Sequence, residues 1–210
     1  MRQSNFNPFR ILCPLFLLFL ALPCNAASVL SPDEVVRETT REVLNRLEMD
    51  KDRLAADPEY IKVVVRELIV PHMDFRTMAG LVLGKDWGVL SDPVKNCFSK
   101  GLRNLLVERY SHILLSYHKH NISYQPAVSI GSQGYYSVTQ TLTRDDRKPL
   151  TIGYPMRRDE EGWSVVDLVI DGVSLVKSYR ITYEKEISEQ GLAEFIYSFQ
   201  ECKNLSTNPG

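Results

Sequence analysis

The chain has 210 residues, with 25 basic and 26 acidic side chains and a formal net charge of −1. Basic and acidic residues alternate along it without a basic stripe, which argues against a nucleic-acid partner. The length that remains after the N-terminal segment suits one domain with a buried core.

The first 27 residues have the pattern of a secretory signal peptide. Arg2 and Arg10 precede an apolar run at 11–22, and small residues follow at 25–27. A run of about a dozen apolar residues is shorter than the ~20 that span a bilayer, so we favour a cleaved signal over a membrane anchor. We therefore expect residues 1–27 to be removed on export.

The cysteines divide between this segment and the mature chain. Cys13 and Cys24 lie in the segment expected to be removed, and Pro23 directly before Cys24 disfavours acylation of a lipoprotein there. Cys97 and Cys202 can form a disulfide in an oxidising compartment, but the sequence leaves their distance open. Neither has a neighbour at metal-ligand spacing, so we expect no metal site.

Helix start signals recur in the first half of the mature domain, which we expect to span residues 28–201 before a flexible tail at 202–210. Residues 31–34, Ser-Pro-Asp-Glu, form a capping box with proline at the first helical position. Residues 57–59, Asp-Pro-Glu, repeat the signal, and Pro71 ends the second helix.

Two more helices are predicted further along. Asp74 caps the third, and Gly84, which tolerates the left-handed conformation, closes it. Residues 91–93, Ser-Asp-Pro, start a fourth helix whose apolar stripe runs to Tyr117. The small Gly101 on this helix lets another element approach closely.

After Pro126 the period of the apolar pattern changes from helical to alternating. Segments at 128–130, 136–140, 152–156 and 163–170 read as four strands separated by turn-rich connections. An antiparallel meander that follows a run of helices is an α+β arrangement, with the helices covering one face of a curved sheet.

The last of these strands is apolar on both faces and is therefore predicted to be central, with Asp167 as the exception. The pattern returns to helical from Ser174. Gly191 ends that helix, and a short final helix follows to Phe199.

Several segments together resemble the MlaC family, also called the toluene-tolerance family, over about residues 32–199. Each is a weak signal alone, but their order and spacing are specific. They are Asp74-Phe75-Arg76, Leu83-Gly84-x-x-Trp87, Leu102-Arg103-x-Leu105-Leu106 followed by Tyr110, and Trp163-Ser164-Val165-Val166-Asp167-x-x-Ile170-Asp171-Gly172-Val173-Ser174-Leu175-Val176. His72 departs from the family pattern, in which an aromatic or aliphatic residue is more usual.

The resemblance implies a sheet like that of nuclear transport factor 2 with added helices, and an apolar cavity for acyl chains. It also implies soluble shuttling of phospholipid across the periplasm of a Gram-negative bacterium. The implied partners are an outer-membrane lipoprotein complex and an inner-membrane ABC transporter with an MCE-domain subunit. We expect a monomer with no cofactor other than the phospholipid cargo.

A lipid carrier must hide on the order of 30 methylenes from water at about 0.8 kcal/mol each, a load that only an enclosed apolar cavity can conceal. The apolar stripes are consistent with such a cavity, although taken alone they favour a filled core. The candidate lining residues on the helices are Phe75, Met78, Val82, Leu102, Leu106, Tyr110 and Ile113. Those on the sheet are Tyr136, Val138, Tyr154, Val166, Leu168 and Ile170.

Asp167 needs a partner if its apolar strand is buried, and Arg76 and Arg180 are the candidates for a structural ion pair. Arg180 or Lys177 could instead meet a lipid phosphate at the cavity mouth.

Two other classes of function remain open. An enzyme of this fold would use Asp167 as base with Tyr136 or Tyr154 as donor, but no histidine is spaced with serine or cysteine as in a nucleophilic site, and we expect no catalytic residues. An adapter with a filled core would dock to membrane complexes without carrying lipid. Exposed cations such as Lys85, Arg103 and Arg109 are candidates for docking whether the protein is a carrier or an adapter.

Overall fold

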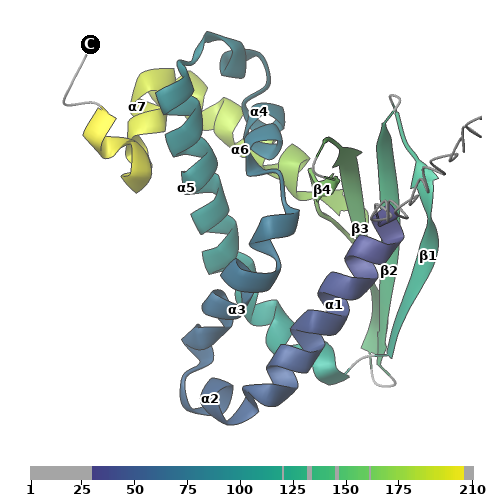
Figure 1. Ribbon diagram of the computed structural model, residues 1–210. Coiled ribbons are helices and arrows are strands. Elements are labelled where there is room, and N and C mark those ends of the chain that lie inside the picture. Colours follow the sequence, from purple (N-terminus) through teal and green to yellow (C-terminus); the bar gives the residue numbers. More distant parts are fainter. Residues whose placement is uncertain (1–29, 120, 132–133, 145–146, 161, 206–210) are drawn as a thin grey trace, which may run out of the picture.

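The structure is a computed structural model that describes residues 30–119, 121–131, 134–144, 147–160 and 162–205. The expected signal peptide lies outside these residues, as do residues 206–210 of the expected tail. A sheet stands on one side of the molecule and a group of helices on the other, with α1 (Pro32–Met49) lying along the sheet (Figure 1).

The N-terminal helices begin at the predicted caps. In α1 the Ser31 hydroxyl accepts the Glu34 backbone N–H, and the Glu34 carboxylate accepts the Ser31 N–H at 2.7 Å, which completes the capping box. The second start signal begins a 3-10 turn, η1 (Pro58–Tyr60), that leads into α3 (Ile61–Leu68). A short helix between them, α2 (Lys51–Ala56), was not predicted.

The predicted third and fourth helices are also present. A 3-10 turn, η2 (Val70–His72), precedes α4 (Phe75–Leu83), whose cap Asp74 accepts the Thr77 N–H at 2.8 Å and which ends at Gly84 with φ 57°. After η3 (Gly84–Val89), α5 (Asp92–Tyr110) stops short of the expected end. The chain continues as the 3-10 segment η4 (Ser111–Lys119).

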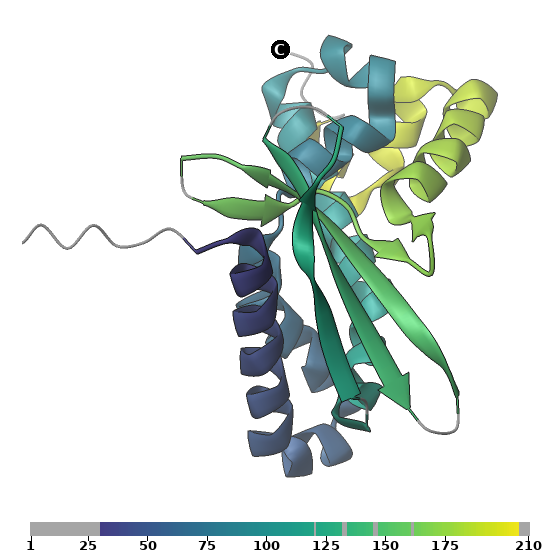
Figure 2. The ribbon, with the colours of Figure 1, turned by 90° about the vertical axis from the view of Figure 1, so that its right-hand side faces the viewer.

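The strands form one six-stranded sheet, antiparallel between its strands, in the order β1-β2-β3-β5-β6, with β4 also paired to β3. Figure 2 shows β1, β2 and β3 as the long strands. Their bounds are β1 (Asn121–Ser129), β2 (Tyr135–Arg144), β3 (Arg147–Arg158), β4 (Trp163–Val165), β5 (Val169–Ile170) and β6 (Val173–Ser174). The α+β class is thus confirmed.

The prediction of one central strand at 163–170 was wrong, because β3 occupies the central position. The backbone leaves the ladder between β4 and β5, where the carboxylate of Asp167 accepts the N–H of Leu168 at 2.7 Å. β1 also begins before Pro126, which lies within a register shift where a residue without an N–H is tolerated.

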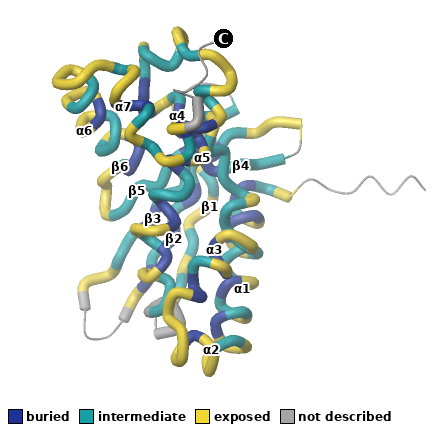
Figure 3. The backbone as a smooth tube through the Cα atoms, turned by 90° about the vertical axis from the view of Figure 1, so that its left-hand side faces the viewer, coloured by how far each residue is buried: buried dark blue, intermediate teal, exposed yellow. Residues whose placement is uncertain are grey.

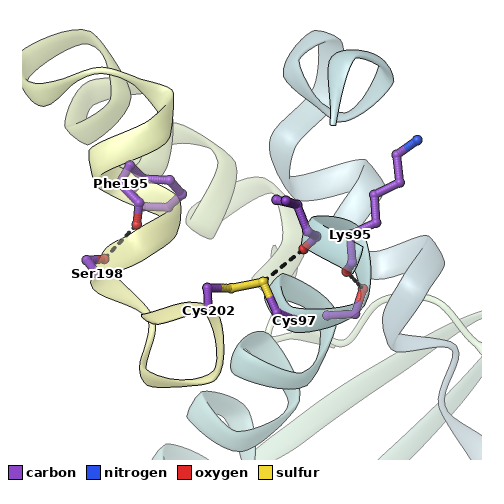
Figure 4. Close-up of a disulfide and its surroundings, with 7 residues drawn as sticks. Lys95, Cys97, Phe195, Ser198 and Cys202 are labelled. Atoms are coloured by element: carbon purple, nitrogen blue, oxygen red, sulfur yellow. Dashed lines mark hydrogen bonds between the residues drawn. A yellow bond between two sulfur atoms is a disulfide. The ribbon is translucent and has the colours of Figure 1, made fainter. Parts of the chain in front are cut away.

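The C-terminal helices are α6 (Leu175–Gln190) and α7 (Leu192–Ser198), broken at Gly191 with φ 87°. A disulfide joins Cys97 of α5 to Cys202, across 105 residues of sequence (Figure 4). Cys202 lies in the 3-10 segment η5 (Gln200–Leu205), so this part of the expected flexible tail is anchored to the domain.

The buried side chains form three apolar clusters. Figure 3 marks in dark blue where buried residues lie along the backbone. The first joins α4, α5, α6 and α7, the second joins α1 and α3 to the far end of β2 and β3, and the third joins the start of α1 to β2, β3 and β4. Leu168, between β4 and β5, packs against all three clusters. The point where the clusters meet is therefore the centre of the fold.

Candidate functional site

A cavity of about 170 Å³ lies where the three clusters meet. It reaches the surface, since Ile113 in its wall is 42% exposed. Its wall is almost entirely apolar and draws on nearly every element of the fold. The part of the chain from α1 to the start of α4 contributes Val35, Val36, Thr39, Thr40, Val43, Val65, Ile69, Val70, His72, Met73 and Phe75. The other lining residues are Leu106, Val107, Tyr110, Ser111, Ile113, Leu114, Ile152, Tyr154, Val165, Leu168, Ile170 and Leu175.

The predicted lining residues divide into two groups. Those that line the cavity are Phe75, Leu106, Tyr110, Ile113, Tyr154, Leu168 and Ile170. Those placed elsewhere are Met78, Val82, Leu102, Tyr136, Val138 and Val166. Of this second group, all but Tyr136 are at most 2% exposed and belong to the packed core. Tyr136 packs edge-on against Trp163, with ring centroids 5.2 Å apart.

The placement of Val166 corrects the expectation that it shares a face with Leu168 and Ile170. That expectation assumed a continuous strand, in which alternate side chains point the same way. Because the ladder is interrupted at 166–168, the alternation shifts, and Val165 replaces Val166 in the cavity wall.

Sequence reasoning missed the contribution of α1, although the signal was present. Val36, Thr39 and Val43 recur at helical spacing, and they line the cavity together with Thr40. A stripe shows that one face of a helix is covered. Whether that face meets neighbouring side chains or a cavity depends on the distance between the helices and the sheet. This distance cannot be predicted from the sequence of the helix alone.

A layer of hydrogen-bonded polar side chains crosses this region. Gln140 of β2 is 0% exposed; its amide oxygen accepts from Tyr154 Oη at 2.7 Å, and its Nε2 donates to Thr40 Oγ1 at 3.1 Å and Tyr124 Oη at 3.3 Å. The layer ties α1 to β1, β2 and β3. Tyr154 and Thr40 carry it to the cavity wall, so the apolar clusters are held in register by specific bonds.

Asp167 is not part of an ion pair, which corrects the sequence interpretation. Its oxygens accept hydrogen bonds from the N–H of Leu168, from the Ser174 hydroxyl and from the N–H of Val176 at 3.0 Å. These groups all lie between β4 and the first turn of α6, so the half-buried carboxylate is hydrogen-bonded locally.

The two arginines proposed as its partners bind elsewhere. Arg76 donates to Asn96 and Asp92 of α5, each at 2.6 Å. Arg180 donates through Nε to the carbonyl of Leu81 at 2.7 Å and so joins α6 to α4. Neither arginine is in the cavity wall.

An ion pair that was not predicted stands beside the cavity. Asp74, between the lining residues Met73 and Phe75, accepts from Arg157 of β3 at 2.7 Å, and its N–H donates to the carbonyl of Val165 at 2.9 Å. Burial acts to raise the pKa of the Asp74 carboxyl, but hydrogen bonds from Thr77 and Arg157 outweigh it and hold that pKa below the ordinary value. The start of α4 is thereby fixed to the sheet.

The chemistry of the cavity wall is suited to holding an apolar group. Within the described parts of the chain, no three histidine, cysteine or acidic side chains gather as a metal site would need. Asp167 would be the base if the protein were an enzyme. Its oxygens accept hydrogen bonds from groups at the turn into α6. Among the helices that the structure describes, none is long and apolar enough to cross a membrane.

Comparison with known proteins identifies the family. The profile described as "MlaC protein" matches residues 37–201, which is most of the chain. The chain belongs to the MlaC family. This confirms the resemblance found in the sequence.

Among curated MlaC relatives, the chain is 20% identical over 174 residues to the "Intermembrane phospholipid transport system binding protein MlaC" of Haemophilus influenzae, covering 81% of each chain. It is also 20% identical over 178 residues to the "Toluene tolerance protein ttg2D" of Pseudomonas putida, covering 84% of this chain and 82% of that one.

A solved structure shares the fold at a TM-score of 0.70 and 22% identity, covering 82% of this chain and 96% of the other. It is the phospholipid-binding protein of Ralstonia solanacearum in complex with a phospholipid.

Proposed function

We propose that this MlaC-family protein is a non-catalytic phospholipid carrier that holds acyl chains in the central cavity. The observation that supports this most directly is the apolar cavity at the meeting point of all three core clusters, where Leu168 lines the wall and packs against each cluster. The names of its relatives agree: one is an intermembrane phospholipid transport protein, and the matching solved structure holds a phospholipid.

The physical requirement is the shielding of hydrocarbon from water. Two acyl chains carry on the order of 30 methylenes at about 0.8 kcal/mol each, so an unshielded lipid costs roughly 20 kcal/mol in water. Valine, leucine, isoleucine and phenylalanine make up most of the cavity wall and offer no competing polar surface. Because both the helices and the sheet contribute to the wall, a slight separation of the two layers would widen the cavity for acyl chains.

The route of transport belongs to the same proposal. The protein would be exported by its N-terminal signal, act in the periplasm, and exchange lipid between an outer-membrane lipoprotein complex and an inner-membrane ABC transporter with an MCE-domain subunit. A protein that crosses an aqueous compartment with its cargo enclosed needs no cofactor and no enzymatic activity.

Native mass spectrometry of the mature protein, purified from the periplasm without detergent, tests the carrier function. We expect close to one phospholipid per chain. Leu168→Trp should remove it by filling the cavity, whereas Ile181→Trp, at a position 61% exposed and outside the cavity, should retain it. Circular dichroism would establish that both variants are folded.

A wild-type protein that is empty on purification and stays empty when offered phospholipid vesicles would contradict the carrier function. It would indicate an adapter that docks to membrane complexes without cargo. Binding to those complexes does not separate the two functions, because a carrier must dock as well.

A further inference from the structure

One residue of the cavity wall differs in kind from the rest. Among the described residues, His72 is the only lining side chain with a nitrogen donor, because the other polar lining groups are hydroxyls of serine, threonine and tyrosine. The wall is otherwise apolar. A ligand with one charged group and long apolar chains would therefore find one position in this wall that can recognise the charge.

The imidazole of His72 has no partner among the residues that the structure describes. Its side chain forms no hydrogen bond or ion pair with another described residue, in contrast to His112, whose Nε2 lies 3.0 Å from Glu59 Oε1. Among the described residues, the buried side-chain nitrogen and oxygen atoms without a hydrogen-bond partner are Thr39 Oγ1, Arg157 Nε and Tyr179 Oη. His72 is not among them, so its ring nitrogens stay accessible to a ligand or to water.

The backbone around His72 is fixed. Its N–H donates to the carbonyl of Ile69 at 3.0 Å, and the following Met73 N–H donates to Val70 at 3.2 Å. Met73 also bridges to Val165 of β4. The preceding Pro71 is exposed, so η2 lies at the surface of the molecule. The imidazole is thus held between the cavity and the solvent on a rigid turn.

The other cations considered for this role lie outside the cavity wall. Arg157 donates to Asp74 at 2.7 Å, and Arg180 is bonded to the carbonyl of Leu81. Lys177, the other residue suggested from the sequence, does not line the cavity. The described part of the cavity wall therefore offers one nitrogen donor side chain to an anion.

We propose that His72 binds the phosphate of the phospholipid head group while the acyl chains occupy the cavity. This rests on the proposed carrier function and specifies where the polar end of the cargo lies. An imidazole N–H donates a hydrogen bond to a phosphate oxygen, and the bond is stronger when the ring is protonated. The turn η2 then defines the head-group end of the site.

The test compares two labelled lipids with the same acyl chains, phosphatidylglycerol and diacylglycerol, which lacks the phosphate. Delipidated mature protein is titrated with each. His72→Leu should weaken phosphatidylglycerol binding at least about tenfold and leave diacylglycerol binding unchanged or stronger. His72→Gln keeps a neutral donor and should fall between them. His112→Leu, the same change outside the cavity, should match the wild type.

The outcomes separate this inference from the carrier function. If the wild type binds phosphatidylglycerol and His72→Leu keeps the same preference for it over diacylglycerol, the phosphate contact is wrong and the carrier function stands. If the wild type binds neither lipid, both fail. If inorganic phosphate alone, added without lipid, shifts the His72 ring resonances at micromolar concentration, the site belongs to free phosphate instead of a lipid head group.

Discussion

Asp167 shows how one carboxylate can end a strand and begin a helix. One of its oxygens accepts the N–H groups of both Leu168 and Val176, and the other accepts the Ser174 hydroxyl. Ser174 in turn caps α6 by accepting the Lys177 N–H at 3.0 Å. The residue therefore stabilises the turn that places Leu168 and Leu175 in the cavity wall.

Removing this carboxylate should destabilise the protein without any change attributable to catalysis. We expect Asp167→Ala to lower the free energy of unfolding by about 2–3 kcal/mol, because backbone N–H groups lose their acceptor. Asp167→Asn keeps one acceptor oxygen and should cost less. Urea denaturation measures both, with Asp52→Ala on the exposed surface of α2 as the control. Equal stability of Asp167→Ala and the wild type would contradict the structural role.

The lowered pKa of Asp74 predicts that the free energy of unfolding depends on pH. Its pKa is lowered by folding, so its stabilisation is present above the ordinary aspartate pKa of about 4 and is lost as the pH falls through the lower folded value. Asp74→Asn should cost about 1 kcal/mol at pH 7, and the difference from the wild type should shrink below about pH 4. Urea denaturation across this range measures it.

The control for this prediction is Asp92→Asn, since Asp92 also pairs with an arginine, Arg76, but is 76% exposed. An exposed pair contributes little, so that variant should follow the wild type at every pH. If the free energies of unfolding of Asp74→Asn and the wild type differ by the same amount from pH 7 to pH 3, the charge of Asp74 is not the source of the stabilisation.

At the scale of elements, the disulfide decides how the C-terminal segment is held. Cys97 on α5 and Cys202 on η5 bring Phe199 onto Phe98, with ring centroids 5.0 Å apart. A Cβ at Gly101 would lie 2.6 Å from the Phe199 ring, so only glycine allows this approach. The covalent link and the aromatic packing therefore act on the same contact.

Breaking the disulfide should lower stability. The bridge closes a loop of 105 residues, and a link of this kind contributes about 2–4 kcal/mol. We expect the Cys97→Ser/Cys202→Ser double variant to melt at a lower temperature than the oxidised wild type, and reduction of the wild type to reproduce the loss. If reduction leaves the melting temperature unchanged, the aromatic packing alone holds η5.

Local signals predicted the helices better than the sheet. Ser31, Asp74 and Gly84 are caps whose chemistry acts within four residues, so the ends they set are visible in the sequence. The break between β4 and β5 depends on Asp167 reaching Val176, nine residues away. Nothing in the alternation of 163–170 reveals that contact, and the same contact decided which side chains reach the cavity.

At the scale of the whole molecule, the cavity exists because the apolar faces of two layers do not meet completely. Leu168 and Ile170 face it from the sheet side, and Leu106 and Tyr110 from α5. These four were among the candidates from the sequence, because they lie on apolar faces. The sequence could not exclude Val138 or Leu102, which lie on equally apolar faces but fill the core, since the distinction depends on a spacing of a few ångströms between layers.

A cavity that spans the junction of all three clusters couples lipid binding to the stability of the entire fold. Ligand that binds only the native state raises the free energy of unfolding by about 2.7 kcal/mol at a hundred times its dissociation constant. For a domain of this size that corresponds to a rise in melting temperature of about 5–10 °C. We therefore expect delipidated protein to melt at a lower temperature and phospholipid to restore it.

Leu168→Trp separates this coupling from general effects of lipid on the protein. Overpacking costs about 1–3 kcal/mol in a filled core, but here the added ring has the cavity to occupy, so the cost in the delipidated state should be at the low end. Its melting temperature should no longer respond to phospholipid, whereas that of Ile181→Trp should respond like the wild type. A wild-type melting temperature that is the same with and without lipid would mean that the three clusters are held together without cargo, and that the cavity is not where the lipid binds.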